Sequence, residues 1–417
     1  MSHVVELIAV GTELLLGSIC NTNAQMLSRE LSSLGLNVYY HTVVGDNPER
    51  LRQAVETAKK RADILITTGG LGPTCDDLTK TVVAACFGRK LVFHPPSAER
   101  IRAYFAHLHP HRPMTENNLQ QAWLPENCTV FDNDWGTAPA CAMEQEGKHA
   151  ILLPGPPAEC LPLFRERVRP YLSRLSEGVI LSHTLKIFGV GESALEFRLR
   201  DKMNAMENPT LAPYAKEGEV ELRLTAKGES VEACEKLLAP AMEELRKELG
   251  SLVYGVDVPG LEHVVLEGLK KTGKTLCTAE SCTGGLLAKR LTDLPGASQV
   301  FLGGVVSYAN RVKAGLLGVP SELLETHGAV SAPVAMAMAE GARAAMGAHL
   351  AVAVTGVAGP DADDRGNPVG LVYLALAHGG GTQVEELRLG SDRGRIRNAA
   401  AGHGLDMVRR YLEEERK

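Results

Sequence analysis

Three short loops in the last third of the chain carry residue types suited to nucleophilic catalysis. They are AESCTGG at 279–285, SYANRVK at 307–313 and TGVAGP at 355–360, and each follows an apolar run that predicts a strand. In the first loop, Gly284 and Gly285 let a ligand approach the backbone closely, because glycine has no Cβ. Backbone N–H groups at such a strand-to-helix turn suit a phosphate or an oxyanion.

Ser281 is the candidate nucleophile of these loops. A serine hydroxyl is a weak nucleophile at neutral pH and needs a base. Lys313 could accept its proton if burial lowers the pKa of the lysine, and Tyr308 could relay or donate a proton. The proton acceptor stays open between these two residues. Serine, lysine, tyrosine and arginine at the strand ends of one sheet are the parts of a Ser-Lys amidohydrolase. The simpler alternative is that Ser281 or Thr283 only caps the following helix.

A second glycine-rich turn lies near the N-terminus, in the stretch from Ile64 to Gly88. This stretch predicts a strand, a turn and a helix, and a phosphate could lie on the backbone of the turn glycines Gly69, Gly70 and Gly72. Asp76 and Asp77 close the turn, although they could simply favour the helix dipole. Glu13 and Asp46 also follow predicted strands, so several carboxylates should gather at one sheet edge. A divalent cation would relieve their mutual repulsion.

Parallel sheets are needed to position these loops. The first 170 residues alternate strand-like and helical segments in a βαβαβ order, which predicts a parallel sheet with helices on both faces. Residues 171–252 have the pattern of a small α+β unit. Residues 253–417 have the pattern of a second α/β domain. We therefore predict two three-layer α/β domains, at 1–170 and 253–417, joined by the small α+β domain. Ligands in such sheets bind at the carboxyl ends of the strands.

Composition narrows the classes of function. The 417 residues are 44% hydrophobic and 23% charged, as in ordinary globular proteins. The net charge of −6 supplies no overall positive field, so we expect no nucleic-acid partner. Nine scattered cysteines without a C-x-x-C pair fit neither a disulfide framework nor a zinc site, and they favour a reducing cytoplasm. No stretch is apolar enough to predict a membrane span.

From about Val253 to Glu415 the chain closely resembles the nicotinamide mononucleotide deamidase family, the C-terminal domain of CinA proteins. The motifs AESCTGG, VVSYANRVKAGLLGV, TGVAGP with NPVG, and GSDRGRIR match in order and spacing. The resemblance implies that Ser281 is the nucleophile and that Tyr308 and Lys313 are its acid–base partners. The substrate contacts that it implies are Thr283, Gly284, Gly285, Asn310, Gly356, Ala358, Gly359 and Arg393.

The chemistry implied by this resemblance needs no metal. Ser281 would attack the carboxamide carbon, ammonia would leave, and water would hydrolyse the acyl-enzyme to nicotinate mononucleotide. Backbone N–H groups would stabilise the oxyanion. Arg393, and less directly Arg397, could hold the phosphate, or both could belong to an ordinary basic helix start. One departure is the acidic loop PDADDRGN, where the family often has glycines. A phosphate facing this loop would be repelled by Asp361, Asp363 and Asp364.

The first 170 residues resemble the MoaB-like, molybdopterin-binding domain that opens CinA proteins. The matching pieces are GTELLLGSICNTN, TTGGLGPTCDDLT, NNLQQAWLP, GTAPA and LPGPPAE. The resemblance implies a pyrophosphatase that uses a divalent metal ion (Mg, Mn or Co) to cleave ADP-ribose to AMP and ribose 5-phosphate. Asp46 and Asp77 are the expected catalytic and metal-binding residues, with Glu13 and Asp76 as further metal ligands. Ala140 stands where family members often have glycine, which weakens the case for a backbone contact there.

The middle segment resembles the KH-like domain of the same family. Its GVGE at 189–192 is one residue short of a GXXG loop, so we expect a role in spacing and dimer contact instead of nucleic-acid clamping. Together these patterns predict a cytoplasmic, homodimeric hydrolase of pyridine-nucleotide salvage. Two alternatives remain open. One is a non-catalytic molybdopterin-binding or DNA-uptake interaction protein, and the other is an enzyme whose main activity is N-terminal.

Overall fold

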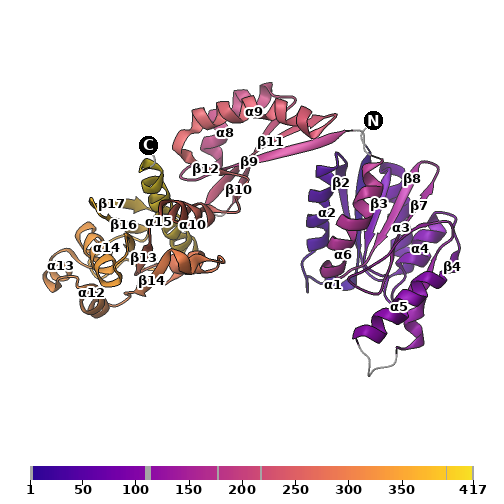
Figure 1. Ribbon diagram of the computed structural model, residues 1–417, viewed down its shortest axis with the longest axis horizontal. Coiled ribbons are helices and arrows are strands. Elements are labelled where there is room, and N and C mark those ends of the chain that lie inside the picture. Colours follow the sequence, from indigo (N-terminus) through magenta and orange to yellow (C-terminus); the bar gives the residue numbers. More distant parts are fainter. Residues whose placement is uncertain (1–2, 109–113, 176–177, 217, 391, 416–417) are drawn as a thin grey trace. The chain divides into compact units, whose positions relative to one another are not determined.

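The computed structural model describes residues 3–108, 114–175, 178–216, 218–390 and 392–415. The chain divides into two compact units, which are described separately: residues 1–181 with 226–236, and residues 182–225 with 237–417. Sheets with helices packed against them make up the chain (Figure 1). The predicted fold class is confirmed, with two α/β domains and a small α+β domain.

A six-stranded sheet in the order β2-β1-β3-β8-β7-β6 forms the centre of the first unit. Its strands are β1 (Val4–Val10), β2 (Asn37–Val44), β3 (Ile64–Thr68), β6 (Thr129–Phe131), β7 (Ala140–Gln145) and β8 (Lys148–Leu153). The first four in spatial order are parallel, and β7 and β6 extend the sheet antiparallel. The parallel part confirms the βαβαβ pattern, because parallel neighbours need a crossover connection. A short ribbon pairs β4 (Leu91–Phe93) with β5 (Trp123–Pro125).

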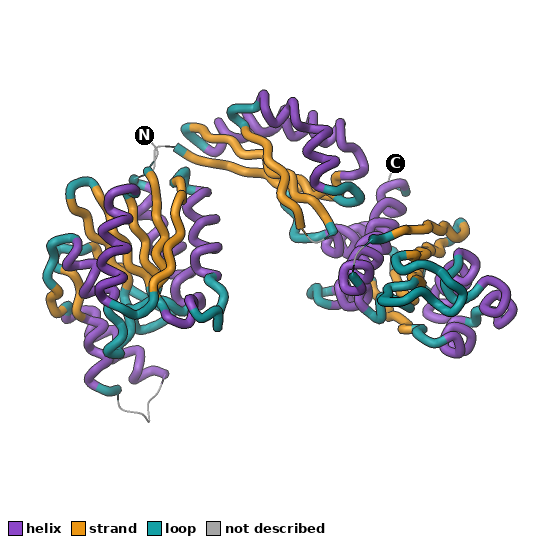
Figure 2. Tube along the Cα trace, turned by 180° about the vertical axis from the view of Figure 1, so that it is seen from behind, coloured by secondary structure: helices purple, strands orange, loops and turns teal. Residues whose placement is uncertain are grey.

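Helices cover both faces of this sheet, so the domain has three layers (Figure 2). Val5 and Leu7 of β1 pack in one cluster with α2 and α6, whereas Ile8 and Val10 pack with α3 and α4 on the opposite face. The helices are α1 (Thr12–Leu15), α2 (Thr22–Ser33), α3 (Pro48–Arg61), α4 (Thr79–Cys86), α5 (Pro95–Leu108), α6 (Pro157–Leu163) and α7 (Arg169–Ser173). A 3-10 helix covers Glu116–Ala122 and a π-helical turn covers Phe164–Val168.

The middle segment forms a four-stranded sheet in the order β10-β11-β9-β12. Its strands are β9 (Val179–Ile187), β10 (Thr210–Lys216), β11 (Glu219–Gly228) and β12 (Val253–Val256). Its helices are α8 (Glu192–Ala205) and α9 (Val231–Leu249), and a 3-10 turn at Gly250–Leu252 precedes β12. Strand β12, which we assigned to the start of the third domain, pairs antiparallel with β9 of this sheet.

The C-terminal sheet has the order β14-β13-β15-β16-β17. Its strands are β13 (Leu276–Glu280), β14 (Phe301–Val306), β15 (Leu350–Gly356), β16 (Leu371–His378) and β17 (Gly381–Arg388). Strands β14, β13 and β15 are parallel, so their carboxyl ends lie at one edge of the sheet. Strands β16 and β17 are antiparallel. We did not predict β17, whose GTQVEELR sequence mixes charged and apolar residues.

Helices also cover both faces of the C-terminal sheet. One core cluster joins the sheet to α10, α11 and α15, and another joins it to α12 and α14. The bounds are α10 (Leu261–Thr272), α11 (Leu286–Thr292), α12 (Asn310–Leu317), α13 (Ser321–His327), α14 (Ala332–Met346) and α15 (Arg393–Glu414), with a 3-10 turn at Ala297–Gln299. The three predicted loops therefore follow β13, β14 and β15 at one edge of one sheet.

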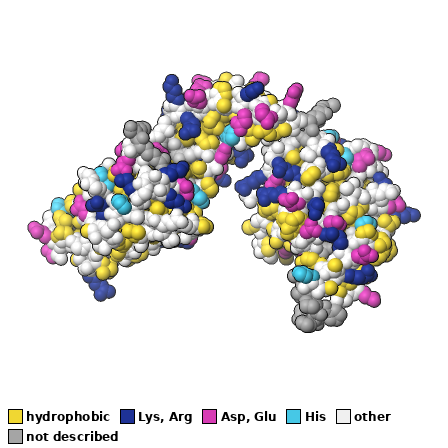
Figure 3. Space-filling view, viewed as in Figure 1, with side chains coloured by type: hydrophobic (Ala, Val, Ile, Leu, Met, Phe, Trp, Pro, Cys, Tyr) yellow, Lys and Arg dark blue, Asp and Glu magenta, His cyan; other side chains and the backbone are white. Residues whose placement is uncertain are grey.

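The surface carries charged side chains of both signs. On the face drawn in Figure 3, basic and acidic side chains are interspersed over the surface. In the part of the chain that the structure describes, we find no helix both long and apolar enough to cross a bilayer.

Candidate active sites

The Ser281 loop begins directly after β13. The Ser281 N–H donates to Val354 O of β15 at 2.9 Å, which ties the start of the loop to the neighbouring strand. Gly284 and Gly285 have φ values of +61° and +92°, a region that other residues rarely adopt. The Gly284 N–H donates back to Ser281 O at 3.1 Å and closes the turn. The two glycines are therefore required by the turn that presents Ser281.

Lys313 of α12 reaches the Ser281 hydroxyl. Only 1% of Lys313 is exposed, and its Nζ lies 3.1 Å from Ser281 Oγ and 2.7 Å from Ser307 O. Burial lowers the pKa of Lys313 to about 8, because the charged form loses its hydration. A neutral amine is therefore accessible near neutral pH, within hydrogen-bond distance of the serine.

The Tyr308 side chain is exposed and contacts Arg393. Its side chain is 63% exposed, and its hydroxyl accepts a hydrogen bond from Arg393 at 3.1 Å. Arg393 also donates to Gly359 O at 2.5 Å, so the three predicted residues form one linked group. Tyr308 meets Lys313 through its backbone oxygen, at 3.5 Å from Nζ. Of the two candidate proton acceptors, Lys313 is the one in direct contact with Ser281.

Glu280 is a residue of this site that the sequence analysis missed. It precedes Ser281, is 1% exposed, and accepts the N–H groups of Gly285 at 2.9 Å, Leu287 at 3.0 Å and Ala288 at 2.8 Å. These are the donors at the start of α11, which a carboxylate satisfies while also complementing the helix dipole. The acidic residue before Ser281 in the AESCTGG motif was the available signal.

The remaining predicted contacts have different surroundings. Thr283 is fully buried and its Oγ1 has no hydrogen-bond partner among the described residues. Arg397 holds the loop, because its guanidinium donates to Cys282 O at 3.1 Å and Thr283 O at 2.8 Å. A Cβ on Gly356 would lie 2.7 Å from the Val372 side chain, so packing alone requires this glycine.

Two predicted contacts and the acidic loop remain. Ala358 is buried after β15, and Asn310 is an exposed first residue of α12. In the acidic loop, Asp363 accepts hydrogen bonds from Asn367 and from the Arg365 N–H, so its carboxylate is used within the loop.

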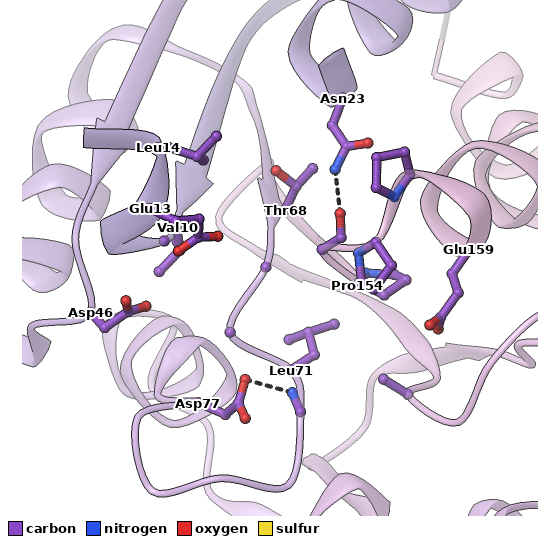
Figure 4. A pocket seen from close by; sticks show the side chains of 18 of the residues that line it. Val10, Glu13, Leu14, Asn23, Asp46, Thr68, Leu71, Asp77, Pro154 and Glu159 are labelled. Atoms are coloured by element: carbon purple, nitrogen blue, oxygen red, sulfur yellow. Dashed lines mark hydrogen bonds between the residues drawn. The ribbon is translucent and has the colours of Figure 1, made fainter. Parts of the chain in front are cut away.

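The N-terminal glycine-rich turn opens on a pocket of about 570 Å³ (Figure 4). The predicted residues that line it are Glu13, Asp46, Gly69, Gly70, Gly72, Asp76 and Asp77. All seven therefore lie around one cavity at the ends of the parallel strands. Other polar residues that the sequence analysis did not single out also line it, among them Asn23, Gln121 and Glu159.

The expected gathering of carboxylates is only partly realised. Within the described residues, no three His, Cys, Asp or Glu side chains lie close enough together to hold one metal ion. Asp46 Oδ2 instead accepts the N–H and the hydroxyl of Thr12 at 2.9 and 2.8 Å. Asp77 accepts the N–H groups of Gly72 at 2.7 Å and Thr74 at 2.8 Å. The two carboxylates thus also fix the loops that carry them.

The glycines of this turn are required by close approach. Gly69 and Gly70 have φ values of +94° and +66°, and a Cβ on Gly69 would lie 2.3 Å from Val10 O. A Cβ on Gly70 would lie 2.1 Å from Thr79 Oγ1. The Gly72 N–H already serves Asp77, so a phosphate on this turn would depend on the other N–H groups.

Comparisons with known proteins match nearly the full length of the chain. Three family profiles match: a probable molybdopterin binding domain at 6–174, a damage-inducible protein CinA KH domain at 182–255, and a CinA C-terminal domain at 259–412. A CinA-like protein of Dictyoglomus turgidum is 49% identical over 407 residues, and one of Kosmotoga olearia is 48% identical. Each alignment covers 98% of both chains.

Among solved structures, competence/damage inducible protein CihA from Agrobacterium tumefaciens is 42% identical. It covers 37% of this chain and 97% of its own, with a TM-score of 0.36.

Proposed function

This chain belongs to the CinA family, and we propose that its C-terminal domain is an amidohydrolase that converts nicotinamide mononucleotide to nicotinate mononucleotide and ammonia. The observation that carries the proposal is the contact of 3.1 Å between Lys313 Nζ and Ser281 Oγ. A buried amine with a pKa of about 8 beside a serine is an activated nucleophile pair. The sequence resemblance to deamidases supplies the substrate.

In the proposed reaction, neutral Lys313 takes the proton of Ser281 as its Oγ attacks the carboxamide carbon. The protonated Lys313 then gives this proton to the leaving nitrogen, and ammonia departs. Water then adds to the acyl-enzyme, with Lys313 again as base, and releases the carboxylate product. The Gly284 and Gly285 N–H groups are already donated to Ser281 O and Glu280. Stabilisation of the oxyanion therefore falls to the preceding backbone, at Cys282 and Thr283.

Arg393 gives the substrate phosphate a fixed cation. It stands at the start of α15 and is linked to Tyr308 and Gly359, which belong to the other two loops of the site. A guanidinium can bind a phosphate through two parallel hydrogen bonds. Tyr308 can orient this arginine through its hydroxyl.

Ser281→Ala tests the proposal directly. Ammonia release from nicotinamide mononucleotide should fall to background, because the variant lacks the hydroxyl that contacts Lys313 Nζ. Ser321→Ala removes an exposed hydroxyl at the start of α13 and should leave the rate unchanged. Ammonia release by the Ser281→Ala variant at the rate of the unaltered chain would show that another residue is the nucleophile.

For the N-terminal domain we propose a metal-dependent ADP-ribose pyrophosphatase. The supporting observation is a single pocket that combines a glycine-rich turn with Asp46, Asp77 and Glu13. Mg²⁺ commonly binds through one or two carboxylates together with substrate phosphates, so this pocket fits an ion completed by the diphosphate. Asp46 and Asp77 would hold it, and Mn²⁺ or Co²⁺ could take its place. Bound there, the ion would neutralise the diphosphate and activate a water.

A chelator separates the two activities. EDTA should abolish release of AMP from ADP-ribose and leave ammonia release from nicotinamide mononucleotide unchanged. The alternative reading, a molybdopterin-binding or DNA-uptake protein without turnover, predicts neither product. Sedimentation of the purified chain would test the predicted homodimer, and fractionation of cells the predicted cytoplasmic location.

A further inference from the structure

The N-terminal pocket has a second polar wall that the diphosphate chemistry does not use. Asn23 of α2 and Glu159 of α6 line it (Figure 4). In this view they lie on one side of the pocket, and Glu13 and Asp46 lie on the other. Hydrogen bonds to the segment that includes Gly155 and Pro156 hold Asn23 and Glu159 in place. Asn23 Nδ2 donates to Gly155 O at 2.7 Å, and the Glu159 N–H donates to Pro156 O at 3.0 Å.

Asn23 presents an unused acceptor. Only 8% of the residue is exposed, and its Oδ1 has no hydrogen-bond partner among the described residues. The amide orientation is set by chemistry, because Gly155 O can only accept and so must face the Nδ2 group. A buried polar atom without a partner is unfavourable, which makes this oxygen a candidate for a ligand donor.

Glu159 is held in place by a loop shaped around it. Its Oε2 accepts Asn133 Nδ2 at 2.8 Å, and Asn133 is itself fixed by bonds to Ala138 O and the Trp135 N–H, both at 3.0 Å. A Cβ on Gly136 would lie 1.8 Å from Glu159 Oε2, so this glycine makes room for the carboxyl group. The loop from Asn133 to Ala138 therefore fixes one oxygen of Glu159, and Oε1 has no hydrogen-bond partner among the described residues.

The charge of the pocket decides what this wall can bind. Among the described residues that line the pocket there is no lysine or arginine. A phosphate would be repelled by Glu159, whereas hydroxyl groups could donate to both Asn23 and Glu159. Carboxylates perform this role for ribose hydroxyls in dinucleotide-binding folds.

We propose that Asn23 and Glu159 form a ribose subsite, in which the two side chains accept hydrogen bonds from vicinal hydroxyls of the nucleotide. This inference rests on the proposed pyrophosphatase function and adds the recognition of the sugar to it. The glycine turn and the Asp46 side bind the diphosphate, and the Glu159 side selects a ligand that carries a ribose.

Binding of two non-hydrolysable probes to the full-length chain with Mg²⁺ tests this division. One probe is α,β-methylene ADP-ribose and the other is methylenediphosphonate, which lacks any ribose. Glu159→Gln keeps an acceptor for Asn133 and should weaken binding of the first probe about tenfold or more, as expected for a lost bond to a charged group. Its affinity for methylenediphosphonate should stay within about twofold.

Two further variants keep the test clear. Glu159→Asp conserves the charge but shortens the side chain, and it should lose affinity for the nucleotide probe in the same way. Glu99→Gln changes an exposed carboxylate outside the pocket and should alter neither affinity. Thermal unfolding of each variant checks that the fold is intact.

Each outcome has a defined meaning. Equal effects of Glu159→Gln on both probes, or no effect on either, would overturn the ribose subsite. Failure of the unaltered chain to bind α,β-methylene ADP-ribose would overturn it as well. If the unaltered chain binds ADP-ribose through Glu159 but releases no AMP, the subsite stands and the proposed hydrolysis fails.

Discussion

Replacing Lys313 by methionine removes the proposed base. The methionine side chain is similar in length to the apolar stem of lysine. The amine is buried and its Nζ lies 3.1 Å from Ser281 Oγ, so it is placed to take the serine proton directly. General-base assistance is worth about 100- to 10,000-fold in rate, and we expect kcat/KM for nicotinamide mononucleotide to fall by that amount. Thermal unfolding of the variant shows whether the fold is kept.

The pH dependence of kcat/KM is a second test of Lys313 as the base. Because the pKa of Lys313 is about 8, roughly one molecule in ten has a neutral lysine at pH 7 and about nine in ten at pH 9. The base must be neutral to act, so kcat/KM should rise about tenfold across this interval and then level off. An unperturbed lysine would still be almost entirely charged at pH 9 and would keep the rate rising beyond it.

Ammonia release can be followed with a coupled glutamate dehydrogenase assay at several substrate concentrations and pH values. Controls with added ammonium chloride measure the pH dependence of the coupling enzyme itself. Two results would refute the reasoning. One is a profile that is flat from pH 6.5 to 9, and the other is a Lys313→Met variant with more than about a tenth of the original kcat/KM.

Three further substitutions test other contacts in the two sites. Glu280→Gln should lower the free energy of unfolding by about 2 kcal/mol or more, since one of its oxygens is replaced by an amide that cannot accept the N–H groups of α11. Urea denaturation measures this, and an unchanged midpoint would contradict it. Arg393→Ala should raise KM for nicotinamide mononucleotide about tenfold with a smaller effect on kcat, because it removes a phosphate contact; steady-state kinetics would contradict this if only kcat changed. Gly136→Ala should destabilise the chain by about 1 kcal/mol, because the added Cβ displaces the Glu159 carboxylate and breaks its hydrogen bond with Asn133. Gly379→Ala, where a Cβ has open space, is its control in thermal unfolding.

Much of the fold follows from local pattern. The alternation of apolar residues in VVELIAV places Val5 and Leu7 on one face of the sheet and Ile8 and Val10 on the other, as observed. The strand β17 escaped prediction because Gln383, Glu385 and Glu386 interrupt its apolar residues at an edge of the sheet. An edge strand has one neighbour and tolerates such charges, so its pattern is weak.

Some features of the candidate sites also follow from the sequence, and others depend on the tertiary structure. The sequence by itself determined the loops after β13, β14 and β15 and the glycines that their turns need, because backbone conformation depends on neighbouring residues. Only the tertiary structure decided that Lys313 is buried against Ser281 while Tyr308 is exposed, and that Glu280 caps α11. Solvent access and hydrogen bonds between distant segments depend on how the elements pack, and the pKa of a lysine depends on that access.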